Sequence, residues 1–294
     1  MIGLVLEKKL LEHGHKIVAV ARRMTDALDQ LNCSENVSIV LCDMCNYGKL
    51  ADMVDGTIDV AVLLAWNGTR GADRNNKALQ QKNIKRNLEI LPQLLKLGCQ
   101  RIVTAGSQAE YGPHAECINE ASECCPNTEY GKAKLEFYKE ASRFCQLNNV
   151  ACIEPRFFSL YGPEDYKDTM VISALQKLLN HEECPLTQGI QMWDYLYVED
   201  ACDALAALCE KESIPSGVYN FGSGDVRPLK DYILEMDLLC GGTGKLLFGA
   251  VPYPPTGMVS LWPDVSKLKD TLMWEPKVSF VDGIRSIMST MLEE

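Results

Sequence analysis

The sequence predicts an α/β protein built on a doubly wound parallel sheet, followed by a smaller and more irregular α/β region. In the first half, runs rich in Val, Ile and Leu alternate with amphipathic helical segments. From about residue 157 prolines and glycines divide the chain into shorter elements, as in "YGPEDY" and "PSGVYNFGSGD". Strands that lack a polar face indicate a sheet covered by helices on both sides. Such sheets bind ligands beyond the carboxyl ends of their strands.

The elements follow from hydrophobic periodicity. Near the start, Val5, Leu6, Leu10 and Leu11 recur at helical spacing, and Gly14 stops that helix before a buried strand. The expected helices fall near 2–13, 47–54, 75–97 and 130–147, and the expected strands are 16–21, 37–43, 58–65, 101–106 and 150–156. We expect residues 1–157, joined again by 195–224, to form a dinucleotide-binding domain, and residues 158–194 and 225–294 to form a substrate-binding region.

Composition excludes several classes of protein. The 294 residues carry a net charge of -11, which disfavours binding to nucleic acid or to an anionic membrane surface. We find neither an apolar run long enough to span a bilayer nor a signal peptide, so we expect a cytoplasmic location. The 13 cysteines are scattered, and we expect free thiols. One C-x-x-C, from Cys42 to Cys45, has no second pair at zinc spacing, so no metal site is expected.

Tyr130 and Lys134 form the central motif. Residues four apart share one face of a helix, so the phenol and the ammonium are expected together. A nearby cation favours the phenolate and would make Tyr130 a general acid/base for a hydroxyl. The alternative is an unremarkable surface tyrosine and lysine. Ser107 follows the strand at 101–106, and so is expected at the edge of the sheet where sites form.

Two glycine-rich segments are interpreted as turns, not phosphate-binding loops. In "GGTGK" (241–245) Leu239 stands where a P-loop has its first glycine, and Leu246 stands where it has Ser or Thr. "GSGDVR" (222–227) contains only a single Gly-x-Gly.

Several motifs occur together in order: "GSQAEYG" (106–112), "YGKAK" (130–134), "PRFFSLYGP" (155–163) and "WDYLYVEDACDAL" (193–205). With them the chain resembles the extended short-chain dehydrogenase/reductases, specifically the NAD(P)-dependent epimerase/dehydratase branch that acts on nucleotide sugars. The resemblance runs from residue 1 to 294. It includes "IDVAVLLAW" for a strand ending in His-Leu-Ala-Ala, "QQKN", "VYNFGSG", and "DVSKLKDTLMWEP" for the closing Asp…Lys…Leu-Gly-Trp-x-Pro segment.

The resemblance implies a Rossmann-like fold and a role for each matching residue. Tyr130 is the acid/base, Lys134 lowers the pKa of Tyr130 and holds the nicotinamide ribose, and Ser107 hydrogen-bonds the reacting oxygen. On the substrate side the implied contacts are Gln108, Ser159 (for the usual Asn) and Trp193 (for an Arg found in many members). Around the cofactor the implied residues, besides Tyr130 and Lys134, are Gly3, Ala21, Arg22, Arg23, Asp43, Met44, Leu64, Ala65, Asn83 and Arg156.

Departures from the family pattern narrow the expected reaction. The 4,6-dehydratases carry an Asp-Glu pair directly after the catalytic Thr, and Gln108 and Ala109 cannot supply that acid and base. Hydride and proton transfer at one carbon remains, with a 4-keto-6-deoxyhexose reductase as the first expectation and a 4-epimerase as the alternative. The segment "LLFGAVPYPPTGMVSLWPDVSKL" resembles the tail of abequose/paratose-type 4-ketoreductases.

Cofactor choice depends on the end of the strand at 16–21. Many NAD-using members carry Asp where this chain has Ala21, and Arg22 or Arg23 could pair with a 2'-phosphate. NADP is therefore favoured over NAD. The alternative is that Arg22 and Arg23 are exposed arginines after a strand, with no role in cofactor binding.

The segment before the first helix is the remaining question. Gly3 matches only the last of the three glycines of the family's phosphate-binding turn, and the family's first strand would lie between those at 16–21 and 58–65. We expect the natural gene product to be longer than this chain, with an internal methionine taken as the start of the sequence. The alternative is a non-catalytic protein with impaired cofactor binding. The resemblance also makes a homodimer, formed through the helix of Tyr130, a reasonable expectation.

Overall fold

The main sheet is parallel and has the order β11–β6–β4–β3. The computed structural model describes residues 1–31, 33–253 and 258–293. The strands of this sheet are β3 (Val60–Leu63), β4 (Arg101–Thr104), β6 (Ala151–Phe157) and β11 (Gly217–Phe221). In the register, Ala61 lies beside Ile102, and Ile102 beside Cys152. The short β5 (Gly106–Ser107) extends the line of β4 and pairs with the end of β6. The expected parallel α/β sheet is confirmed.

The first two strands form a separate sheet. β1 (Ile17–Ala21) pairs in parallel with β2 (Val37–Leu41) alone, with Ala19 beside Ile39. Within the described ranges, β1 and β3 each have one edge with no partner strand. The sheet is therefore interrupted between β1 and β3, where the sequence analysis places the family's first strand.

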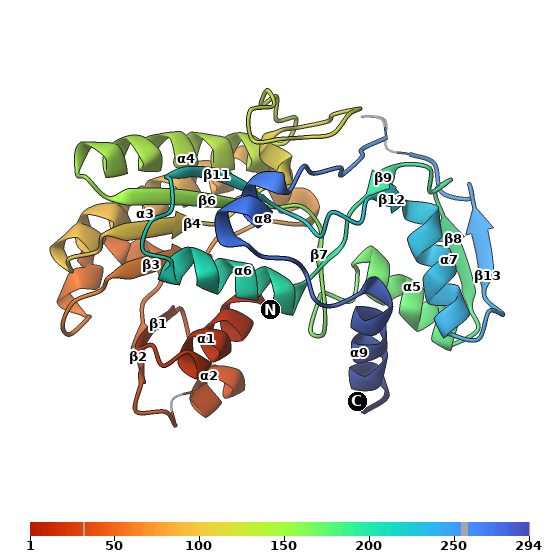
Figure 1. Cartoon of the computed structure of the whole chain (residues 1–294), viewed down its shortest axis with the longest axis horizontal. Coiled ribbons are helices and arrows are strands. Elements are labelled where there is room, and N and C mark those ends of the chain that lie inside the picture. Colours follow the sequence, from red (N-terminus) through yellow and green to blue (C-terminus); the bar gives the residue numbers. More distant parts are fainter. Residues whose placement is uncertain (32, 254–257, 294) are drawn as a thin grey trace.

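Helices cover both faces of the sheet, as Figure 1 shows: α3 (Lys77–Lys96) and α4 (Glu129–Leu147) lie on one side, and α1 (Ile2–Glu12) and α6 (Val198–Glu210) on the other. Adjacent residues of β4 explain why. Ile102 and Val103 are both fully buried, and Ile102 joins the core beneath α3 and α4 while Val103 joins the core beneath α1 and α6. A strand apolar on both faces must be covered twice.

One expectation for local structure was wrong, and one helix was not predicted. Residues 44–52 form a 3-10 helix, η1 (Met44–Asp52), where an ordinary helix at 47–54 was predicted. The carboxylate of Asp43 accepts a hydrogen bond from the backbone N–H of Cys45, which starts η1 three residues early. The short α2 (Asp26–Leu31) was not predicted, since six residues carry too little periodicity.

The other end of the molecule holds a smaller group of elements (Figure 1). Its core includes Tyr161, Leu175, Tyr232 and Ile284. Three short pairs of strands occur here, β7 with β10, β8 with β13, and β9 with β12. The elements are β7 (Leu160–Tyr161), α5 (Met170–Leu179), β8 (Glu183–Leu186), β9 (Met192–Trp193), β10 (Leu196–Tyr197), β12 (Arg227–Pro228), α7 (Leu229–Leu239), β13 (Lys245–Phe248) and α9 (Phe280–Glu293).

One segment of the expected substrate region packs elsewhere. Leu268 of α8 (Ser266–Leu272) and Trp274 lie in the core beneath α6 and β11, with the main sheet. The part of the expected reductase-like tail at 254–257 lies outside the described residues. Among the helices that the structure describes, none combines the length and the apolar character needed to cross a bilayer.

Candidate active site

Ser107 is fixed at the carboxyl end of the sheet. It ends β5 and caps the short η3 (Gln108–Glu110). Its Oγ accepts a hydrogen bond from the backbone N–H of Ala109 at 3.3 Å, and its own backbone N–H donates to Oε1 of Glu110 at 2.8 Å. This reciprocal cap holds the hydroxyl where the strand stops.

Tyr130 reaches Ser107 because the first turn of α4 lies directly against η3. A Cβ added at Gly131 would come within 2.2 Å of the carbonyl oxygen of Ala109, so only glycine permits this approach. The ring of Tyr130 is 7% exposed. Burial raises the pKa of Tyr130, whereas hydrogen bonding with the Ser107 side chain and the charge of Arg74 act in the opposite direction.

Lys134 lies one turn further along α4 and is 4% exposed. Its Nζ donates to the carbonyl oxygen of Ala105 at 2.8 Å and lies 3.9 Å from the ring centroid of Trp66. Burial lowers the pKa of Lys134 to about 8, against the opposing charges of Glu110 and Glu154. The expected neighbourhood of Tyr130 and Lys134 on one helix is present, but the ammonium is engaged by Ala105 and Trp66.

A buried charge cluster supports this corner. Arg156 contacts Glu154 (Nε to Oε2, 2.8 Å) and Glu110 (Nη2 to Oε2, 3.1 Å), and all three side chains are at most 3% exposed. Burial, and after it the charge of Glu110, raises the pKa of Glu154 well above its ordinary value. The resemblance implied that Arg156 contacts the cofactor. Since it also donates to Cys124 and stacks on Tyr111, we assign it to the scaffold.

The loop after β3 supplies residues that the sequence analysis missed. Trp66 donates through Nε1 to Oε1 of Gln80 at 2.8 Å. Arg74, in η2 (Gly71–Asn75), lies with its guanidinium carbon 4.6 Å from the ring centroid of Tyr130. No local motif marks these residues. The sequence could have pointed to them only through their position, because the loop follows β3 at the edge of the sheet where ligands bind.

The residues expected around the cofactor lie at several strand ends. Gly3 is in the first turn of α1, where an added Cβ would lie 3.7 Å from Leu64, and Ala65 beyond it is exposed. Asp43 is half-buried, and hydrogen bonds from Cys45 lower its pKa first, with smaller contributions from Arg86 and Arg22. Ala21 ends β1, Arg22 and Arg23 are exposed, and Met44 is buried.

Asn83 serves the loop directly. Its Nδ2 donates to the carbonyl oxygen of Asn67 at 2.8 Å, and its Oδ1 accepts from the backbone N–H of Asn67 at 3.3 Å. Its amide therefore fixes the loop that carries Trp66 and Arg74, which is a structural role.

These residues fit a dinucleotide. No side chain caps the first turn of α1, and helix N-termini of this kind bind phosphate groups. The exposed Arg22 follows the end of β1, and Asp43 follows the end of β2, at the edge where parallel sheets bind ligands. Tyr130 and Lys134 lie in the first two turns of α4, beside the carboxyl ends of the strands.

On the expected substrate side, Gln108 and Ser159 are half-buried. The backbone oxygen of Ser159 accepts from the N–H of Leu196 at 2.9 Å, so Ser159 joins β7 to β10. The ring of Trp193 packs against Tyr195, with centroids 6.1 Å apart. Next to it, the buried carboxylate of Asp194 accepts hydrogen bonds from the backbone N–H groups of Ser223 and Gly224, both at 2.7 Å. The N–H groups of the Gly-x-Gly turn at 222–224 therefore bind the carboxylate of Asp194, and they are not free to bind a phosphate.

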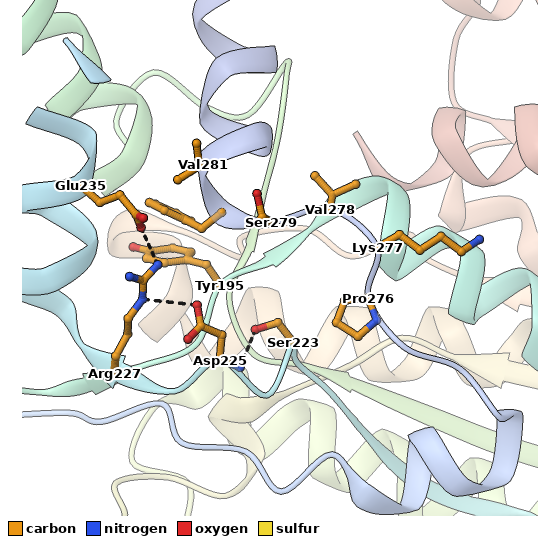
Figure 2. Close-up of a pocket in the computed structure, with 11 residues that line it drawn as sticks. Tyr195, Ser223, Asp225, Arg227, Glu235, Pro276, Lys277, Val278, Ser279 and Val281 are labelled. Atoms are coloured by element: carbon orange, nitrogen blue, oxygen red, sulfur yellow. Dashed lines mark hydrogen bonds and ion pairs between the residues drawn. The ribbon is translucent and has the colours of Figure 1, made fainter. Parts of the chain in front are cut away.

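A cavity of about 450 Å³ lies between β12, α7 and the start of α9 (Figure 2), and its lining does not include Ser107, Tyr130 or Lys134. Its one arginine, Arg227, is paired with Glu235 at 2.6 Å and with Asp225 at 3.3 Å. The cavity therefore offers no unpaired arginine to a ligand. Within the described ranges no group of three His, Cys, Asp or Glu side chains could hold a metal ion, and all 13 cysteines are free.

A parallel α/β sheet that brings a serine, a tyrosine and a lysine to its strand ends has the arrangement of a short-chain dehydrogenase/reductase of the extended type. Comparison of the sequence with family models then shows that the chain belongs to the NAD dependent epimerase/dehydratase family, whose model matches residues 1–222. It is an enzyme of that class.

Three comparisons place it further. The UDP-glucuronate 4-epimerase of Thermodesulfobacterium geofontis is 23% identical over 300 residues, covering 97% of this chain and 91% of that protein. The dTDP-6-deoxy-L-talose 4-dehydrogenase (NAD(+)) of Aggregatibacter actinomycetemcomitans is 24% identical over 246 residues, covering 80% and 85%. The structure of UDP-glucuronic acid 4-epimerase from Bacillus cereus with UDP-glucuronic acid and NAD aligns with a TM-score of 0.82 and 20% identity, covering 99% and 96%. At that identity the structural likeness establishes the fold alone.

Proposed function

We propose that this enzyme is an NAD-dependent 4-epimerase of a nucleotide sugar, with Tyr130 as its acid/base. The observation that carries the proposal is the convergence of Ser107 and Tyr130 at the strand ends, with Lys134 one turn away. The sequence analysis ranked the 4-keto reductase first. The relatives support the epimerase at least as well, since one of them is a UDP-glucuronate 4-epimerase.

The chemistry of the chain's own groups is proton transfer. The phenolate of Tyr130 accepts the proton of the sugar hydroxyl, and the same phenol returns it when the carbonyl is reduced from the other face. Ser107 would donate a hydrogen bond to the reacting oxygen, and Lys134 would hold the ribose of the cofactor. A bound NAD would supply hydride transfer at the sugar carbon. Elimination of water is not part of this scheme, because Gln108 and Ala109 supply neither acid nor base.

The first experiment is incubation of the purified chain with NAD and either UDP-glucuronate or UDP-glucose, followed by NMR of the 4-position. We expect interconversion of the 4-epimers, and a loss of about 10²–10⁴-fold in Tyr130→Phe from removal of the acid/base. A Tyr130→Phe variant as active as the parent would refute the role of Tyr130.

A 4-keto-6-deoxyhexose reductase that uses NADPH is the second candidate. It is favoured by Ala21, which leaves no carboxylate at the end of β1, and by the exposed Arg22 and Arg23. Oxidation of NADPH by a dTDP-4-keto-6-deoxyhexose, without interconversion of any 4-hydroxy sugar, would select this candidate. The homodimer and the cytoplasmic location stay predictions, and sedimentation equilibrium measures the first of them.

A further inference from the structure

Arg74 is a second cation at the candidate acid/base. Its guanidinium lies over the face of the Tyr130 ring, with Cζ 4.6 Å from the centroid. Its Nη1 donates to the backbone oxygen of Thr69 at 3.0 Å, and the residue is half-buried. A cation in this position is attracted by the neutral ring and still more by a phenolate, whose charge spreads into the ring.

Arg74 has no carboxylate partner among the described residues. Burial lowers its pKa, Tyr130 acts in the opposite direction, and Arg70 adds to the lowering. A partly buried cation without a counter-ion is costly. The group next to it that can become an anion is the phenol of Tyr130.

Lys134 differs from Arg74 in this respect. The charges of Glu110 and Glu154 favour the protonated form of Lys134, so its positive charge is partly offset. The same two carboxyl groups raise the pKa of Tyr130. Of the two cations close to Tyr130, Arg74 is therefore the one whose field is not cancelled by a neighbouring acid.

The loop that carries Arg74 is held in place by side-chain hydrogen bonds. Nε2 of Gln80 donates to the backbone oxygens of Gly68 and Asp73, at 2.8 and 3.0 Å. Asn76 caps α3 by accepting from the N–H of Leu79 at 3.2 Å. These contacts fix the backbone on both sides of Arg74, so the guanidinium is preorganised over the ring.

We propose that Arg74 is a positioning residue that stabilises the phenolate of Tyr130 and so sets the pH range in which the enzyme works. The proposal rests on the function proposed for Tyr130. The charged and titratable groups that face the phenol are then Arg74 from η2, Glu110 from η3 and Glu154 from β6, with Lys134 on its own helix. The hydroxyl of Ser107 from β5 contributes a hydrogen bond.

The test measures the ionisation of Tyr130 without any substrate. The tyrosines of the full chain are replaced by 3-fluorotyrosine, whose phenol ionises at lower pH, and the fluorine resonance of residue 130 is assigned by its loss in Tyr130→Phe. In Arg74→Gln we expect that resonance to titrate about one pH unit higher than in the parent. Arg74→Lys should restore part of the shift, because it keeps the charge.

Arg70→Gln is the matched control. Arg70 lies in the same loop but pairs with Asp165 at 3.3 Å, and we expect its removal to leave the titration of Tyr130 in place. An unchanged titration in Arg74→Gln overturns the proposal, as does an equal shift in Arg70→Gln.

Activity separates this proposal from the function on which it rests. With UDP-glucuronate or UDP-glucose, we expect Arg74→Gln to lose about tenfold in kcat at pH 7 and to recover at higher pH, with KM little changed. An effect on KM alone overturns the proposal in favour of substrate binding by Arg74. A fully active Tyr130→Phe refutes the proposed function, whereas the fluorine titration still decides the role of Arg74.

Discussion

Lys134 illustrates at the scale of one residue how a functional group lowers stability. It is 4% exposed, and burial lowers its pKa to about 8 from 10.5. Between these two values the unfolded chain binds more protons than the folded chain, so this residue makes stability rise with pH from 8 to 10.5. At pH 7 the folded chain carries the full cost of burying the ammonium.

We therefore expect Lys134→Met to increase the free energy of unfolding at pH 7 by up to about 3 kcal/mol, while activity is lost. This increase in stability should become smaller as the pH rises from 8 to 10.5, because Lys134 in the folded parent loses its proton over this range. Urea denaturation at several pH values measures this. Lys132→Met, an exposed change on the same helix, is the control and should alter stability by less than about 0.5 kcal/mol. A Lys134→Met variant that is less stable at pH 7 would contradict the argument.

Glu154 and Arg156 give a second prediction at this scale. Burial raises the pKa of Glu154 well above its ordinary value and so favours the protonated carboxyl, and Arg156 pairs with both Glu154 and Glu110. We expect Glu154→Gln, a neutral replacement of the same shape, to change the free energy of unfolding by less than about 1 kcal/mol. Arg156→Met should cost about 3–5 kcal/mol, because it leaves a buried carboxylate unpaired. A cost of about 3–5 kcal/mol for Glu154→Gln, measured in urea at pH 7, would contradict the preference of Glu154 for its protonated form.

At the scale of elements, the crossing of α4 over η3 decides whether Tyr130 meets Ser107. Gly131 is the point of closest approach, and a Cβ there would overlap the backbone oxygen of Ala109. Because both partners are backbone, the helix would have to move.

We expect Gly131→Ala to lower kcat by about 10²-fold, since a displacement of about 1 Å is enough to misplace reacting groups. Overpacking should also lower the free energy of unfolding by about 1–3 kcal/mol. Gly48→Ala is the control, because an added Cβ at Gly48 has no heavy atom within 4 Å. Steady-state kinetics and thermal unfolding of the two variants test the argument, and a fully active Gly131→Ala would show that the helix can yield.

The sequence analysis predicted the elements whose buried residues produce a periodic hydrophobic pattern in the sequence. The strands at 101–106 and 150–156 were predicted because successive residues, which point to opposite faces of a strand, are both apolar, as Ile102 and Val103 are. The helices of Lys77–Lys96 and Glu129–Leu147 were predicted within two residues at each end. The six residues of α2 leave no such record, and neither does the carboxylate cap that starts η1 at Asp43.

The site was predicted only as far as its motifs extend along the chain. Ser107 and the Tyr130–Lys134 spacing follow from local patterns. The direction of the Lys134 ammonium does not, because Ala105 and Trp66 lie on other elements. Arg74 meets Tyr130, and Glu110 meets Arg156, only through the fold, since these pairs are 56 and 46 residues apart in the sequence.

At the scale of the whole molecule, the proposed cofactor would contact elements from both sheets: α1 and the end of β1 on one side, and α4 on the other. A ligand that binds only the folded chain adds to its stability by mass action. At a concentration 100 times its Kd, NAD should raise the free energy of unfolding by about 2.7 kcal/mol.

This response also distinguishes the two cofactors. We expect NAD to raise the thermal midpoint more than NADP at equal concentration. If NADP has the larger effect, Arg22→Ala should reduce that effect while leaving the response to NAD intact, because Arg22 is exposed at the end of β1 and would meet only the 2'-phosphate. No shift with either dinucleotide would contradict cofactor binding by this chain.

The interruption of the sheet between β1 and β3 has a consequence for local unfolding. No backbone hydrogen bond between described residues joins β1 and β2 to the main sheet, so this pair is tied to the rest by side-chain contacts and by the connecting chain. Such a unit can open without the global transition, and its amide protons should exchange with solvent much faster than those of β4 and β6. A dinucleotide bound across both sheets would slow that exchange, so the cofactor would complete the cooperative unit that the strands leave divided.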